Sequence, residues 1–293
     1  MVKWAAGLAM VLLLSSCGDS TTAATTTTAA VGTTTTQAVA IAYPTGADQS
    51  VVVVRSGGGF LPPEIYFRQL VPGFVLAGDG RVVTIGPGGA PASPAFPSLQ
   101  ERTISKAGIT EILESGRSAG LFDETIDFGR PGVTDLGSTG IVIVADGRTH
   151  TTGIYALGFN DDKPGLDLTV AQSEARGRVT RFLRSLEPSV GRHGDSARPY
   201  SFSAMALFSF PARSATSNPE TDWPLADLAS FGEPYLRGPG SGVRCAVVRG
   251  GDLDRVVDAM KSATSETVWR SQGTRYDVIP RPLFPHEKSC DDV

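Results

Sequence analysis

The sequence predicts an α+β fold: an antiparallel sheet of hairpins covered by helices, followed by a second, smaller α+β unit. Three observations predict it. Apolar runs flank two Asp-Gly turns, amphipathic helix patterns separate and follow these hairpins, and a strand-helix-strand pattern comes near the C-terminus. The 34 glycines and 20 prolines indicate many turns, which favours a β-containing domain over a helix bundle. With 41% hydrophobic and 19% charged residues, the chain has enough apolar material for a folded core.

The first strands are predicted from apolar runs bounded by turn residues. Residues 51–54 and 65–70 have strand character and are separated by a loop rich in glycine and proline. Four further runs flank the two Asp-Gly dipeptides: 74–76 and 81–85 around Asp79-Gly80, and 140–144 and 148–155 around Asp146-Gly147. Because Asp-Gly readily adopts the positive φ angles of a tight hairpin, both pairs are predicted to be hairpins.

Two helices accompany the hairpins. Ser105 is expected to cap the first, which places Ile109, Ile112 and Leu113 on one side and ends near Gly116 and Gly120. The second is predicted over residues 168–186. Its apolar positions share one face: Ala171, Ala175, Val179, Phe182 and Leu186. Its arginines are expected to face water: Arg176, Arg178, Arg181 and Arg184. A solvated face is the ordinary interpretation of this positive stripe, and partner binding is the alternative.

A polar, turn-rich stretch at residues 188–198 predicts a boundary, after which the second unit begins. Residues 202–210 and 244–248 are apolar strand candidates. Asp252 is expected to cap a helix with Leu253, Val256, Val257 and Met260 inward, and residues 275–281 return as a strand. This order predicts a compact α+β layer.

The N-terminus indicates export. Lys3 precedes a small or apolar run at residues 4–14, which is too short to cross a bilayer core of about 30 Å and is typical of a signal peptide. The run ends in Leu14-Ser15-Ser16-Cys17, and here the sequence resembles bacterial lipoprotein precursors. The resemblance implies cleavage before Cys17, acylation of its thiol, and a protein anchored by lipid to the cell membrane and facing outside the cytoplasm. The alternative is an ordinary secretory peptide that contains a cysteine by accident.

Four regions are therefore expected: a signal peptide at 1–16, a lipid anchor and Thr/Ala-rich tether at 17–45, a hairpin-and-helix domain at 46–190, and a smaller domain at 198–293. The tether is a plain spacer or a carrier of O-linked sugars. Loss of Lys3 with the signal peptide changes the formal net charge from -4 to -5. This acidic balance disfavours nucleic acid as a partner and leaves the membrane, reached through the lipid on Cys17, as the expected one.

Two cysteines remain for an oxidising compartment. Cys245 and Cys290 are predicted to form a structural disulfide. Two buried free thiols or a redox pair are the alternatives, and the wide spacing without a Cys-x-x-Cys motif disfavours the redox pair.

Candidate chemical motifs are few, and none predicts a catalytic residue, a metal site or a cofactor. Residues 116–120 satisfy Gly-x-Ser-x-Gly, but a helix precedes the serine where a nucleophile elbow needs a strand. His150, His193 and His286 are widely separated and lack zinc-ligand spacing. Asn160-Asp161-Asp162 with Asp167 lacks the spacing of an EF-hand loop. The glycines at 57–59 and 238–242 lack the features of a phosphate cradle and are expected to form loops.

The body of the chain carries a second resemblance. Residues 66–155 resemble extracytoplasmic bacterial domains of unknown function that share two Asp-Gly turns, a helix ending in Ala-Gly-Leu-Phe and a Thr-Asp segment. Here these elements lie at 78–81, 119–122, 133–135 and 146–148. The exported body as a whole is similar to uncharacterised lipoproteins of high-GC Gram-positive bacteria, down to the closing Arg281-Pro282-Leu283 with Pro285, Glu287 and Cys290. Neither resemblance implies an activity.

The sequence thus predicts a lipid-anchored binding or envelope-interaction module, not an enzyme. The alternative is an envelope hydrolase whose site is assembled from residues distant in sequence. Convergence of Ser, His and Asp, or of two carboxylates, in one cleft favours the hydrolase, and a flat surface with an apolar patch favours binding.

The lipid anchor can be tested directly. We expect Cys17→Ser to abolish metabolic labelling with fatty acid and to leave uncleaved precursor or protein released to the medium, because the acylated thiol is gone. Labelling that persists in this variant contradicts the assignment.

Overall fold

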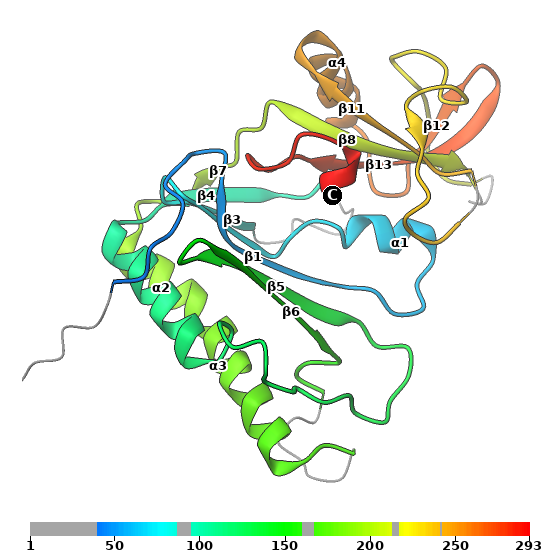
Figure 1. Ribbon diagram of the computed structural model, residues 1–293. Coiled ribbons are helices and arrows are strands. Elements are labelled where there is room, and N and C mark those ends of the chain that lie inside the picture. Colours follow the sequence, from blue (N-terminus) through cyan, green and yellow to red (C-terminus); the bar gives the residue numbers. More distant parts are fainter. Residues whose placement is uncertain (1–39, 87–94, 160–166, 213–216, 241) are drawn as a thin grey trace, which may run out of the picture. The chain divides into compact units, whose positions relative to one another are not determined.

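The structure, a computed structural model, describes residues 40–86, 95–159, 167–212, 217–240 and 242–293. Within it, Ala40–Val293 forms one compact unit. Two mainly antiparallel sheets and four helices make up this unit, which confirms the predicted α+β class (Figure 1). The expectations for Cys17, for the signal peptide and for most of the tether lie outside the described residues.

The first sheet has seven strands in the order β6-β5-β1-β2-β3-β4-β7, and every neighbouring pair is antiparallel. Its strands are β1 (Ser50–Gly57), β2 (Phe74–Ala77), β3 (Arg81–Ile85), β4 (Leu99–Thr103), β5 (Ser138–Ala145), β6 (Arg148–Tyr155) and β7 (Arg198–Pro199). Both predicted hairpins are present, as β2-β3 and β5-β6. In the second, Asp146 and Gly147 have φ angles of 51° and 72°, which a tight hairpin turn requires.

Helices α2 (Lys106–Ser118) and α3 (Val170–His193) lie side by side over one face of the first sheet (Figure 1). Ser105 caps α2 as predicted, since its side chain accepts a hydrogen bond from the Gly108 backbone at 3.3 Å. Apolar residues of both helices pack with Val52, Ile141 and other strand residues in one core cluster. The periodicity therefore located this face correctly except at Ala171, which is exposed at the start of α3.

One predicted strand is wrong. Part of residues 65–70 instead forms helix α1 (Pro63–Arg68), with Pro63 in the first turn and Glu64 beside it. Proline and an acidic residue both favour a helix N-terminus. Phe67 is fully buried and stacks on Phe208 at 4.7 Å between ring centroids, so α1 is fixed by a contact that lies far away in the sequence.

The second predicted helix also differs in two respects. It begins two residues late, at Val170, after the capping box of Thr169 and Gln172, and it continues through Pro188 to His193. Ser189, Arg192 and His193 all contact Glu111 of α2, which holds the added residues 187–193 in place. Arg176 does not face water. It is fully buried and donates to the backbone oxygens of Phe128, Tyr155 and Ala156.

The second sheet has six strands in the order β10-β11-β8-β13-β12-β9, of which only the β12-β9 pair is parallel. Its strands are β8 (Ala204–Pro211), β9 (Glu220–Asp222), β10 (Glu233–Pro234), β11 (Arg244–Arg249), β12 (Val268–Ser271) and β13 (Thr274–Pro282). Helix α4 (Gly250–Met260) packs on one face, and α1 packs on the other. Asp252 is not the cap of α4: it lies in the first turn, where it pairs with Arg255.

The division at residues 190–198 stays a prediction. The strands before this division form the first sheet and those after it form the second, except β7, which follows the division but pairs with β4 of the first sheet. Helix α1 in turn belongs to the earlier segment but packs on β13 of the second sheet. None of the described helices is long and apolar enough to cross a membrane.

The two predicted partner cysteines lie at disulfide-bonding distance. The sulfur atoms of Cys245, in β11, and Cys290, at the start of a short 3-10 helix (Cys290–Asp292), are 2.06 Å apart, and the Cα atoms are 6.2 Å apart. The pair ties the last residues of the chain to a strand of the second sheet.

Loss of this bridge should loosen the C-terminus selectively. We expect Cys290→Ser to lower the free energy of unfolding by about 2–5 kcal/mol, because a native bridge restricts the unfolded chain. Urea unfolding measures the loss, and trypsin should cleave faster after Lys288, which lies two residues before the bridge. Cys17→Ser is the matched control and should leave both unchanged. Two alkylatable thiols at positions 245 and 290 in the unreduced, denatured protein contradict the bridge itself.

Candidate functional site

The C-terminal segment contains a fully buried ion pair. Arg281, in β13, and Glu287, in the loop that follows, both have side chains with no solvent exposure. Both terminal nitrogens of Arg281 donate to the carboxylate, with Nη2 2.8 Å from Oε1. The planar guanidinium thus matches the carboxylate in a bidentate arrangement.

Groups from three other places in the chain complete the pair. Nε and Nη2 of Arg281 donate to the Leu70 backbone oxygen at 3.3 and 3.2 Å. Glu287 accepts from the Phe284 backbone at 2.9 Å and from Nη2 of Arg55, in β1, at 3.0 Å. We call Arg55, Leu70, Arg281, Phe284 and Glu287 the buried ion-pair cluster. It connects the first sheet, the segment after α1 and the second sheet.

A small pocket lies beside this cluster, on the face of the first sheet that α2 and α3 do not cover. Its volume is about 250 Å³. Val53, Gly140, Val142 and Thr151 supply its floor, and Ser50, Arg55 and His286 also line it. The lining is predominantly apolar, with the nitrogen-bearing groups coming from one strand and from the C-terminal loop.

A pair of glycines keeps this part of the sheet bare. Gly140 in β5 lies directly opposite Gly153 in β6, so both lack a side chain on the same face. A Cβ added at Gly140 would meet only the Arg55 backbone oxygen, at 4.0 Å, and one at Gly153 would meet nothing within 4 Å. The pocket therefore depends on the missing side chain of Gly140, which is part of its floor, whereas Gly153 does not line it.

Burial shapes the electrostatics of the pocket. Burial lowers the pKa of Arg55, and the nearby carboxylate of Glu287 opposes this effect. Burial also lowers the pKa of His286 below its ordinary value of 6.5, so the ring is mostly neutral at pH 7. Nε of Arg55 is buried and has no hydrogen-bond partner among the described residues.

Tyr200 fixes the C-terminal segment against the first sheet. Its hydroxyl donates to the Leu283 backbone oxygen at 2.9 Å, and its ring stacks on Phe284 at 5.7 Å. Burial raises its pKa to about 12, so the hydroxyl keeps its proton at neutral pH. Tyr200 therefore fixes the segment that carries His286 through two neighbouring residues, Leu283 and Phe284.

The pocket brings Ser50 and His286 together, but not as a catalytic triad. No Ser or Thr hydroxyl in the described part of the chain makes a hydrogen bond to a histidine ring; His193, at the end of α3, instead contacts Glu111 at 2.9 Å. Glu287, next to His286, has both oxygens engaged by arginines. The Gly-x-Ser-x-Gly stretch lies elsewhere: Ser118 is the exposed last residue of α2.

The remaining sequence candidates lie apart from the pocket. His150, in β6, is buried against Phe122, on the helix-covered side of the sheet. The two predicted glycine loops contain several glycines with positive φ, including Gly58, Gly59, Gly238 and Gly240. Residues 160–162 lie outside the described residues. In the ranges that the structure describes, no group of three or more His, Cys, Asp or Glu is placed to hold a metal ion.

No protein-family model, curated protein or solved structure matches the chain.

Sequence reasoning placed His286 in a C-terminal loop but missed the pocket. A signal was present in Arg281, a charged residue within a run that otherwise reads as a buried strand. A charge at such a position needs a partner, and the carboxylate of Glu287 follows six residues later.

The buried pair predicts a large effect from a small change. We expect Glu287→Gln to lower the free energy of unfolding by about 3–5 kcal/mol, because it leaves the Arg281 charge buried without its carboxylate. Denaturant unfolding checks this. Glu111→Gln is the matched control, since Glu111 also contacts an arginine and a histidine but is 39% exposed. Equal losses in the two variants contradict the argument from burial.

Proposed function

We propose that this chain is a lipid-anchored extracytoplasmic binding protein whose ligand occupies the pocket beside the buried ion-pair cluster. The Leu14-Ser15-Ser16-Cys17 motif and the threonine-rich tether support the anchored location. The pocket supports binding, because apolar floors with a few converging polar groups are the usual form of small-ligand sites.

The lining specifies the ligand's chemistry. Val53 and Val142 favour an apolar body, while Arg55 and His286 favour an acidic or carbonyl head group. A volume of about 250 Å³ lies just below the range of about 300–1,000 Å³ common for such sites, so the pocket fits a small molecule or one end of a longer one. We therefore infer an amphipathic ligand with one acidic head.

The observation that carries the proposal is an apolar pocket over Gly140 with Arg55 and His286 in its lining. A tightly packed sheet face would bear a side chain at Gly140. The hydrolase alternative has no such support, because no described histidine is hydrogen-bonded to a hydroxyl nucleophile.

Fluorescent probes test the pocket. We expect the full chain to bind anilinonaphthalene sulfonate saturably, and Gly140→Val to abolish this binding because its side chain fills the floor. Gly153→Val is the matched control: it adds the same side chain to the facing strand at a position that does not line the pocket. Titration of probe fluorescence against protein concentration gives the affinities.

The head-group assignment needs a second comparison. Arg55→Met should weaken binding of the sulfonate probe about tenfold, the equivalent of about 1.4 kcal/mol, and should leave binding of the uncharged phenylnaphthylamine unchanged. Absence of saturable binding by either probe, or full binding by Gly140→Val, contradicts the proposed function.

A further inference from the structure

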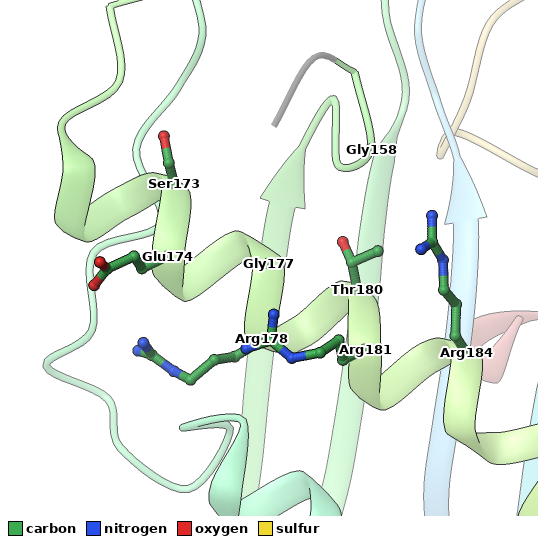
Figure 2. A pocket seen from close by; sticks show the side chains of 8 residues that line it. All are labelled: Gly158, Ser173, Glu174, Gly177, Arg178, Thr180, Arg181 and Arg184. Carbon is green, nitrogen blue, oxygen red and sulfur yellow. The ribbon is translucent and has the colours of Figure 1, made fainter. Parts of the chain in front are cut away.

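A second hollow lies on α3, away from the pocket that we propose as the ligand site. Its volume is about 730 Å³, and all of its described lining residues except Gly158 belong to α3 (Figure 2). This helix covers the first sheet with Val179, Phe182 and Leu186, whereas the hollow is lined by residues that point away from that core.

Three arginines give the hollow its charge. Arg178, Arg181 and Arg184 line it together with one carboxylate, Glu174. Among the described residues, none of the three arginines forms an ion pair or a hydrogen bond with another side chain. Exposed arginines elsewhere commonly do: Arg117, Arg192, Arg198, Arg237, Arg255 and Arg270 each contact a carboxylate. Arg130 and Arg148 also lack a carboxylate partner among the described residues, so what distinguishes Arg178, Arg181 and Arg184 is that three such arginines follow one another on one helix of a chain with a formal net charge of -4.

Gly177 opens the surface between these arginines. It lies within the helix, where glycine destabilises by about 1 kcal/mol relative to alanine. Nη1 of Arg181 lies 3.6 Å from the position that a Cβ on Gly177 would take, so this guanidinium lies across the bare turn. A larger side chain at position 177 would occupy the hollow.

Hydroxyl groups add to the donors. Oγ1 of Thr180 is buried and has no hydrogen-bond partner in the part of the chain that the structure describes. Figure 2 shows Ser173, Thr180 and Arg184 pointing to the side of α3 on which Gly158 lies. A phosphate oxygen in the hollow meets the hydroxyl of Ser173, and it meets that of Thr180 only where the atoms that cover Oγ1 move aside.

We propose that this hollow binds a compact ligand with two or more phosphate groups. Arg178, Arg181 and Arg184 are three residues apart, so they spread over about 9 Å along the helix axis and about 120° around it, an area that several phosphate groups cover better than a single anion. Arginine forks bind phosphate oxygens bidentately, and tetrahedral phosphates leave further oxygens for the hydroxyls. The phosphates come from a free oligophosphate or from the headgroups of an anionic membrane.

Calorimetric titration of the full-length chain with inorganic tripolyphosphate at low ionic strength tests the proposal. We expect saturable binding that weakens as salt is added, because the arginines are exposed or half-buried. Arg181→Gln should raise Kd about tenfold, the equivalent of about 1.4 kcal/mol, and the triple variant with Arg178→Gln and Arg184→Gln should abolish binding. Arg148→Gln, an exposed arginine of β6, is the charge-matched control and should bind as the parent does.

The shape of the hollow is tested separately from its charge. Gly177→Leu should abolish binding without changing any charge, whereas Gly191→Leu, also on α3 with open space around it, should not. Circular dichroism and the unfolding temperature establish that each variant is folded.

A second experiment distinguishes a free oligophosphate from lipid headgroups as the source of the phosphates. The chain is sedimented with phosphatidylglycerol vesicles and, for comparison, with neutral phosphatidylcholine vesicles. Binding to the phosphatidylglycerol vesicles but not to tripolyphosphate, with loss of binding in the triple variant, assigns the site to lipid headgroups. Binding of tripolyphosphate with the same dependence assigns it to a free ligand. Citrate binding as tightly as tripolyphosphate overturns the preference for phosphate. Failure of both tripolyphosphate and vesicles to bind, or equal binding by the triple variant, overturns the site, and neither result bears on the pocket near His286.

Discussion

The buried pair of Arg281 and Glu287 is the constraint around which the two sheets are arranged. A charge without solvent or partner is unfavourable by several kcal/mol, so both side chains must be fully hydrogen-bonded in the folded state. Their bonds to Leu70 and Arg55 can form only when the segment after α1 and strand β1 lie against the end of β13. A buried ion pair adds little net stability over apolar packing, but it penalises other arrangements of these segments. We therefore regard the pair as a device that specifies how the sheets meet.

The proposed ligand pocket inherits its geometry from this constraint. His286 lies between the buried Glu287 and the stacked Phe284, and neither neighbour can move without breaking hydrogen bonds in the cluster. Cys290 then fixes the end of the segment to β11. The pocket thus has a wall of fixed position and a floor on the paired strands β1, β5 and β6, which is the preorganisation that a binding site with few polar contacts needs.

Local patterns were sufficient to predict the hairpins and the helix-covered face, whereas features decided by distant contacts were not. Asp146 and Gly147 both take the positive φ angles that this dipeptide favours, although in the first hairpin only Gly80 does so, and Ser105 caps α2 with its own side chain. By contrast, α1 is short enough that its propensity is weak, and it is fixed by Phe67 packing on Phe208. Arg176 was expected in water because arginine usually faces solvent, but it is buried and donates hydrogen bonds to the backbone oxygens of Phe128, Tyr155 and Ala156. The pocket was missed for the same reason, since Arg55 and His286 are brought together only by the meeting of the sheets.

The two proposed sites lie on opposite sides of the first sheet, and this separation has a consequence for how the protein can act. The pocket opens on the face formed by Val53 and Val142, whereas the arginines lie on the outer side of the helix that covers the other face. An occupant of one hollow therefore does not obstruct the other. Between them stands a close-packed layer that includes Ile141, Ile143 and Val179, and such layers transmit small shifts poorly unless they have two distinct packings. The arrangement suits a module that holds an amphipathic ligand on one side while its basic helix contacts phosphates on the other, with the two affinities independent.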